Sequence, residues 1–192
     1  NRLPLFLCSS LHIVIPIASF TKVERVREAC FDYIAPFGIV SLIAGTFLAT
    51  NYYPRSLLNF ELNYNVAIHC LIGFCGIYII ASNFVKFKLK NYWITNVILL
   101  TVEVLSLIMI KVNLAYPVYR SGGFESNYMF LRHDGGTPFT LITSFVKGNT
   151  VLYTLGVIVI YHLILALFYI VINLIVLIVK RISLKKKQAL TK

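Results

Sequence analysis

The 192-residue chain is 58% hydrophobic and only 13% charged, with 18 Lys and Arg residues, 7 Asp and Glu residues and a formal net charge of +11. A soluble domain is about 45–50% apolar and about 25% charged, and a disordered chain needs low hydrophobicity. The composition therefore excludes both classes. A basic excess often indicates nucleic-acid binding, but in a membrane protein it first reports orientation. We predict an integral membrane protein with no nucleic-acid partner.

Five segments are apolar enough to cross a bilayer, which takes about 20 residues of helix. Alternation of polar and apolar residues, the mark of an outer-membrane barrel, is absent. We therefore predict an all-α fold, a polytopic helical membrane bundle that forms one transmembrane domain over residues 1–192. The last segment is long enough to tilt or to continue past the bilayer. The expected spans, in chain order, are residues 3–20, 34–50, 66–85, 92–116 and 151–179.

The loops between these spans predict their orientation, because Lys and Arg gather on the cytoplasmic side. One side, which includes the basic tail over residues 180–192, carries 12 of these residues, and the other side carries 5. The C-terminus is therefore expected in the cytoplasm and Asn1 outside. The first span lacks the basic start and the cleavage site of a signal peptide. We expect a further helix upstream, and hence a parent protein of six spans.

One connection, over residues 117–150, is much longer than the others and is expected on the outside. It contains two Gly-Gly pairs and most of the polar residues that are not basic anchors. Long structureless loops are uncommon in compact domains and are often functional. This loop is therefore a candidate part of any external site.

Ionisable side chains inside a membrane are costly and are functional candidates by default. Counted from the expected span starts at about 1.5 Å per residue, Cys8 lies roughly 8 Å and His69 roughly 5 Å below the outer surface. We therefore expect both at one level. A thiolate is a nucleophile, and an imidazole can take its proton, so the pair is a candidate catalytic site. The full set of candidates is Cys8, His12, His69, Glu103 and His162.

Each candidate also has a structural interpretation. A free cysteine is often a small buried hydrophobe, and a membrane histidine often bonds across helices. His12 follows Cys8 by four residues and shares its helix face, so it is either a rival base or a packing residue. Glu103 lies near the middle of the bilayer, where it must be protonated or paired. His162 is expected to be structural.

No metal site and no cofactor are predicted. The four cysteines form no C-x-x-C pair, which argues against zinc and against a disulfide framework. The chain has no phosphate-binding loop, no serine elbow and no H-E-x-x-H helix. The cysteines other than Cys8 are Cys30, Cys70 and Cys75.

Three blocks of sequence together resemble one known family. They are Leu3-Pro4-Leu5-Phe6-Leu7-Cys8, Asn65-Val66-Ala67-Ile68-His69 and Asn127-Tyr128-Met129-Phe130-Leu131. Their order and spacing resemble the YwaF-type bacterial integral membrane proteins, which are related to the eukaryotic acyltransferase transmembrane protein 164. The resemblance extends loosely from the first block to about Pro138. It implies at least six helices and a multi-pass protein of the bacterial plasma membrane.

In the eukaryotic relative, a membrane cysteine and a histidine carry phospholipid acyl transfer, and these positions match Cys8 and His69. The resemblance therefore implies an acyltransferase that acts on membrane phospholipids near the outer leaflet. Cys8, with its proton taken by His69, would attack an acyl ester carbonyl and form a thioester. A lyso-lipid would then accept the acyl chain.

The outer loop has two interpretations. In the catalytic one, Asn127 and Tyr128 donate hydrogen bonds to the oxyanion or to the glycerol backbone, and Arg132 and His133 bind the lipid phosphate. In the structural one, Asn127 and Tyr128 fix a turn, and Arg132 is solvated.

Two functions without a nucleophile are also consistent with the sequence. A non-catalytic membrane subunit that captures or transports a small substrate would use the outer loop and Glu103. A structural subunit would use every polar residue of the spans to link helices. In both cases Cys8→Ser would be tolerated, whereas an acyltransferase would lose its activity. The sequence assigns no protein partner and no oligomeric state.

Overall fold

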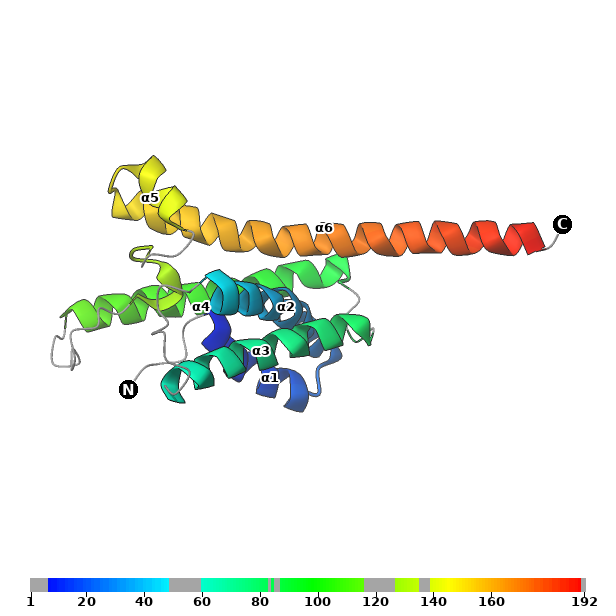
Figure 1. Ribbon diagram of the computed structural model, residues 1–192, viewed down its shortest axis with the longest axis horizontal. Coiled ribbons are helices and arrows are strands. Elements are labelled where there is room, and N and C mark those ends of the chain that lie inside the picture. Colours follow the sequence, from blue (N-terminus) through cyan, green and yellow to red (C-terminus); the bar gives the residue numbers. More distant parts are fainter. Residues whose placement is uncertain are drawn as a thin grey trace.

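The chain folds as helices that gather into a bundle. The computed structural model describes residues 7–48, 60–82, 84, 87–115, 127–134 and 139–190, and all regular structure in these residues is helical. Figure 1 shows α1 to α4 gathered together and the longer α6 lying along them and projecting past them. The elements in chain order are α1 (Leu7–Phe20), α2 (Glu24–Ile43), η1 (Ala44–Leu48), α3 (Phe60–Ala81), α4 (Leu89–Ala115), η4 (Tyr128–Phe130), α5 (Thr140–Val146) and α6 (Thr150–Leu190).

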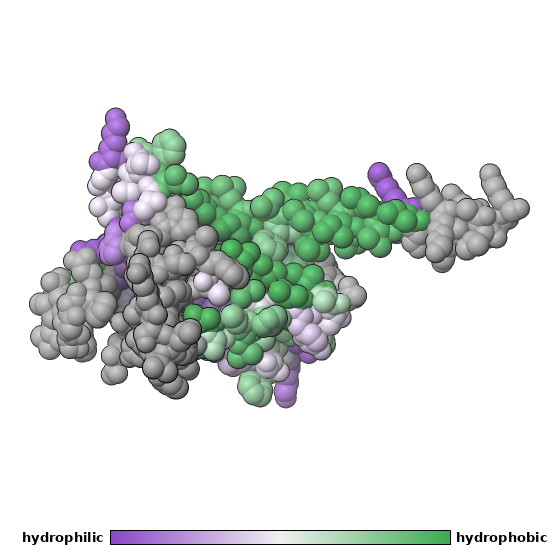
Figure 2. All heavy atoms as spheres, in the orientation of Figure 1, coloured by the Kyte–Doolittle hydropathy of each residue, from purple (hydrophilic) through white to green (hydrophobic). Residues whose placement is uncertain are grey.

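Three helical stretches are long and apolar enough to cross a membrane: Glu24–Thr46, Leu89–Ala115 and Thr150–Ile182. Two further apolar helices, Cys8–Phe20 and Val66–Ala81, are shorter. Hydrophobic side chains cover most of the visible face of α6, as Figure 2 shows. The all-α prediction is confirmed, and the three long helices fit a membrane-embedded protein. The count of five spans, and of six in the parent protein, stays a prediction.

Helix α2 lies at the centre of the bundle, because it contacts α1, α3, α4 and α6. Its closest approach is to α3. A Cβ atom on Gly38 would lie 2.8 Å from the carbonyl oxygen of Ile72, and one on Gly76 would lie 2.8 Å from the carbonyl oxygen of Ala35. Small residues allow membrane helices to approach this closely. The two glycines therefore set the register between α2 and α3.

Several boundaries differ from the prediction. Helix α2 begins at Glu24, about ten residues before the expected span, and α6 continues through the basic tail to Leu190. Hydropathy locates only the apolar part of a helix. Because Lys, Arg and Glu are themselves good helix formers, the helices extend beyond their apolar segments. The described part of the outer loop contains two short helical elements, η4 and α5. Residues 117–126 and 135–138 of that loop lie outside the described residues.

Candidate functional site

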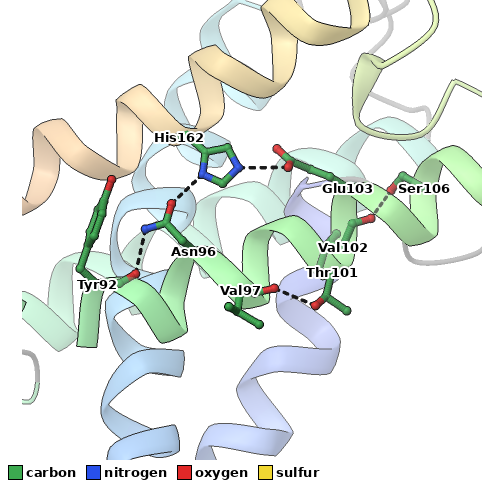
Figure 3. A network of polar contacts seen from close by, with 8 residues as sticks. All are labelled: Tyr92, Asn96, Val97, Thr101, Val102, Glu103, Ser106 and His162. Atoms are coloured by element: carbon green, nitrogen blue, oxygen red, sulfur yellow. Dashed lines mark hydrogen bonds and ion pairs between the residues drawn. The ribbon is translucent and has the colours of Figure 1, made fainter. Parts of the chain in front are cut away.

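A polar centre with one buried carboxyl and a His162 side chain that is 28% exposed joins α4 to α6 (Figure 3). The His162 imidazole on α6 lies between two side chains of α4: its Nδ1 is 2.6 Å from Asn96 Oδ1, and its Nε2 is 3.2 Å from Glu103 Oε2. Asn96 and Glu103 are seven positions apart, or about two helical turns, so they share one face of α4. Glu103 is only 1% exposed. One carboxyl and one imidazole therefore meet inside the bundle.

The hydrogen bonds determine how many protons the centre holds. Asn96 Nδ2 donates to the carbonyl oxygen of Tyr92 at 2.8 Å, which turns Asn96 Oδ1 toward His162. An amide oxygen only accepts, so His162 Nδ1 carries a hydrogen. If the ring is neutral, Nε2 has no hydrogen and the Glu103 carboxyl supplies one; if the ring is charged, Nε2 has it and Glu103 is ionised. In both states one proton lies between Glu103 Oε2 and His162 Nε2.

The second carboxyl oxygen of Glu103 has no partner. Oε1 is buried and makes no hydrogen bond within the described part of the chain. A buried polar atom without a partner costs free energy, and ionisable residues within membranes mark proton and ion pathways. The centre therefore has a buried carboxyl oxygen that can take up a proton without breaking an existing bond.

The two residues of the expected catalytic pair have different neighbours. Cys8 Sγ lies 3.9 Å from Ser9 Oγ, and Cys8 packs against the hydrophobic core. The His69 imidazole lies against Gly45 in η1, where a Cβ atom would be 1.8 Å from His69 Nδ1. Among the described residues, that Nδ1 is buried without a hydrogen-bond partner. His69 therefore has a nitrogen that can accept a proton, and its side chain lies against η1.

The helices that carry Cys8 and His69 meet different parts of the bundle. On α1, Ser10 Oγ is 2.9 Å from Tyr33 Oη of α2, whereas His69 on α3 lies against Gly45 in η1.

The shared level of Cys8 and His69 and the catalytic role of the pair both stay predictions.

His12, the rival base, lies on the exposed face of α1. Its Nδ1 is 3.2 Å from the carbonyl oxygen of Ser9 in the same helix. It therefore does not belong to the polar centre that contains Glu103.

The side chain of Asn127 organises the outer segment, by which we mean residues 127–134. Its Oδ1 accepts hydrogen bonds from the backbone N–H groups of Arg132 (3.0 Å) and His133 (3.3 Å). Its Nδ2 donates to the carbonyl oxygen of His133 at 2.7 Å and lies 3.2 Å from Nδ1 of the same residue. Asn127 thus brings Arg132 and His133 next to itself, and its amide is fully used within the segment. This geometry favours the turn-fixing interpretation of Asn127.

The outer segment is docked against α6 by three side-chain hydroxyls. Tyr153 donates to the carbonyl oxygen of Phe130 (3.0 Å), and Tyr161 donates to that of Met129 (3.0 Å). The third bond runs from Thr154 to the carbonyl oxygen of Leu131 (2.7 Å). Tyr128 and Met129 are buried, and Met129 has a left-handed φ of 52°. These bonds and the burial of Tyr128 and Met129 hold the non-helical backbone of the segment against α6. The segment reaches Tyr161, the residue next to His162.

Sequence reasoning identified Glu103 but missed its partners. It assigned His162 a structural role and did not single out Asn96. The spacing of Asn96 and Glu103 on one face of α4 was available as a signal. The register that brings His162 between them depends on the packing of α6 against α4, so it cannot be predicted from the sequence of either helix alone.

Within the described residues, no three His, Cys, Asp or Glu side chains come together as a metal site would require. The chain matches no protein-family model, no curated protein and no solved structure.

Proposed function

We propose that this chain is an integral membrane protein of the substrate-capture or transport class, in which Glu103 and His162 bind and release a proton within the bilayer. The observation that carries this proposal is the arrangement of Glu103: one oxygen lies 3.2 Å from His162 Nε2, and the other is buried without a hydrogen-bond partner among the described residues. The positive-inside pattern supports a cytoplasmic C-terminus. The resemblance to YwaF-type proteins supports a bacterial plasma membrane.

The main alternative is that the centre only links α4 to α6. A purely structural link gains most when all its polar atoms are satisfied, because a half-satisfied buried network is costly. The Asn96–His162–Glu103 chain leaves Glu103 Oε1 open, although neutral residues could join the two helices at no such cost. A role in which Glu103 changes its protonation state accounts for the retention of the carboxyl.

Proton flux into proteoliposomes tests this function. The purified protein is reconstituted with a pH-sensitive dye inside, and flux is driven by a potassium diffusion potential. We expect Glu103→Gln to lower the flux by about a hundredfold, because the amide keeps the shape of the carboxyl but cannot titrate, and a positioned acid–base group contributes about 10²–10⁴-fold.

The matched control is Thr101→Val on the exposed face of the same helix. The hydroxyl that it removes donates to the carbonyl oxygen of Val97 and does not contact Glu103 or His162 among the described residues. The flux of this variant should equal that of the unmodified protein. Equal flux in the Glu103→Gln protein and in the unmodified protein would exclude Glu103 as the proton-binding group.

A second candidate function is phospholipid acyl transfer by Cys8 and His69, with membrane phospholipids as substrates. It is supported by the open, buried Nδ1 of His69, which can accept a proton. In this reaction Cys8 Sγ bonds to the acyl carbon, the ester C–O bond breaks, and the leaving lyso-lipid oxygen takes the proton held by His69. A second lyso-lipid hydroxyl then attacks the thioester and regenerates the thiol.

A phospholipid with a radiolabelled acyl chain tests this second function. We expect a hydroxylamine-sensitive label on the unmodified protein and on a Cys75→Ser control, and no label on Cys8→Ser. A label that persists in Cys8→Ser would exclude Cys8 as the nucleophile and leave the proton-binding proposal as the stronger one.

A further inference from the structure

A second buried carboxyl lies at the cytoplasmic end of the bundle. Asp32 on α2 is 1% exposed, and its Oδ2 accepts a hydrogen bond from Tyr169 Oη of α6 at 2.7 Å. The same Tyr169 hydroxyl is 3.1 Å from Thr95 Oγ1 of α4. The Asn91 side chain and the Phe87 backbone also lie within hydrogen-bonding reach of Asp32. Three helices therefore converge on this carboxyl.

Next to Asp32 is a buried acceptor that lacks a donor. Asn91 is 1% exposed, its Nδ2 donates to Glu28 Oε2 at 2.9 Å, and its Oδ1 has no partner among the described residues. A buried polar atom without a partner costs free energy, so the polar groups around Asp32 are not fully paired with one another.

The buried face of α4 connects this site with the Glu103 centre. Its buried residues recur about every four positions and are Asn91, Thr95, Leu99, Glu103, Ser106 and Ile110. Leu99 on α4 and Leu165 on α6 are both fully buried. The Thr95–Tyr169 and Glu103–His162 contacts set the register of the two helices and place these leucines between them. Thr95 and Glu103 are about 12 Å apart along the helix.

We propose that Asp32 is a second proton-binding site, which exchanges protons with the cytoplasmic side and is separated from Glu103 by an apolar layer of Leu99 and Leu165. The step is the transfer of one proton from cytoplasmic water to the Asp32 carboxylate and its return. This inference rests on the proposed function only for the connection to Glu103. The binding of a proton at Asp32 stands on its own geometry.

The groups around Asp32 fit a site open to the cytoplasmic side. On its own helix, Glu28 lies one turn nearer the helix start and forms an ion pair with Lys88. The residues that face Asp32 from the other helices are Asn91 and Thr95 on α4 and Tyr169 on α6. No cation bonds directly to Asp32 among the described residues, and the nearby charge of Lys88 is paired with Glu28. The Glu28–Lys88 pair provides half-buried groups through which protons can arrive.

Infrared difference spectra of the reconstituted protein, recorded between acidic and alkaline buffer, test this proposal. Protonated carboxyls absorb apart from the amide bands, and we expect two such bands that appear on acidification. Asp32→Asn should remove one of them, and Glu103→Gln should remove the other. Tyr169→Phe removes the hydroxyl that bonds to Asp32, so it should shift the first band and leave the second in place.

The matched control is Tyr153→Phe, which removes a hydroxyl from the same helix without a contact to Asp32; both bands should remain unshifted. Flux measured in the same proteoliposomes should fall about a hundredfold in Asp32→Asn. If a band disappears in Glu103→Gln but no band depends on Asp32 or Tyr169, the second site is overturned and the first remains. If a band disappears in Asp32→Asn but none disappears in Glu103→Gln, the proposed function is overturned and this inference is retained.

Because Asp32→Asn removes a buried group with several partners, its fold is checked by the melting temperature in detergent. Tyr169→Phe keeps the carboxyl and provides the second route to the same answer. An unshifted Asp32 band in a folded Tyr169→Phe protein would contradict the assignment of that band to Asp32.

Discussion

The outer segment and the Glu103–His162 centre both use an amide and a histidine, yet they differ in how completely their polar atoms are paired. The side-chain oxygen and nitrogen of Asn127 both form hydrogen bonds with the backbone of the segment it organises, and the nitrogen also lies beside the His133 ring. In the membrane centre, Asn96 fixes the tautomer of His162, and Glu103 keeps one oxygen open. Complete pairing is typical of a structural role, and an open buried atom is typical of a group that changes state.

The sharpest way to test this difference is to remove His162 and leave Glu103 alone. His162→Leu takes away the partner of a carboxyl that is 1% exposed. Removing one member of a buried pair costs about 3–5 kcal/mol, because it leaves an uncompensated charge. We expect a loss of this size in the free energy of unfolding, measured by equilibrium unfolding in mixed detergent micelles. A loss below about 1 kcal/mol would mean that Glu103 is neutral or has another partner.

The outer segment should respond to the loss of Asn127. Asn127→Ala removes two acceptor contacts and one clear donor contact. At about 0.5–1.5 kcal/mol for each of the three hydrogen bonds, the expected loss is about 1.5–4.5 kcal/mol. Asn127→Asp serves as the control, because it keeps the two acceptor contacts and loses only the donor. If the alanine and aspartate variants are equally unstable, the acceptor contacts do not hold the segment.

The helical architecture could be predicted from the sequence, whereas most of the polar centre could not. Long apolar segments and separated Lys and Arg clusters indicate where the helices lie. The reason is that a backbone that spans lipid must make all its N–H and C=O hydrogen bonds within the protein. Glu103 was identifiable because a carboxyl inside a span is expensive. Its pairing with His162, 59 positions further along the chain, depends on the register between α4 and α6. That register results from packing at Thr95, Tyr169, Leu99 and Leu165.

The positions of Cys8 and His69 illustrate what residue counting leaves out. The close approach at Gly38 and Gly76 fixes the register of α3 on α2, and the Ser10–Tyr33 contact fixes that of α1 independently. Neither apolar segment carries information about either register.

Gly45 offers a smaller test, which concerns His69. Gly45→Ala places a methyl group where the imidazole now lies, 1.8 Å from Nδ1. The ring must move, and overpacking of this kind costs about 1–3 kcal/mol. We expect a lower melting temperature and unchanged proton flux, because His69 contacts Gly45 of η1, whereas Glu103 is bonded to His162 of α6. A fall in flux as large as that of Glu103→Gln would connect His69 to the proton path.

The smallest expected effect on stability comes from removing both members of the Glu103–His162 pair. Glu103→Leu combined with His162→Leu leaves no unpaired charge, and replacing a buried ion pair with apolar residues is often neutral or stabilising. We expect unfolding free energy within about 1 kcal/mol of the unmodified protein, together with complete loss of proton flux. If the double variant is as unstable as His162→Leu alone, the pair is a structural link, because its removal costs stability even when no charge is left behind. Retained stability with lost flux would instead show that the bundle does not need this pair to fold and keeps it for its chemistry.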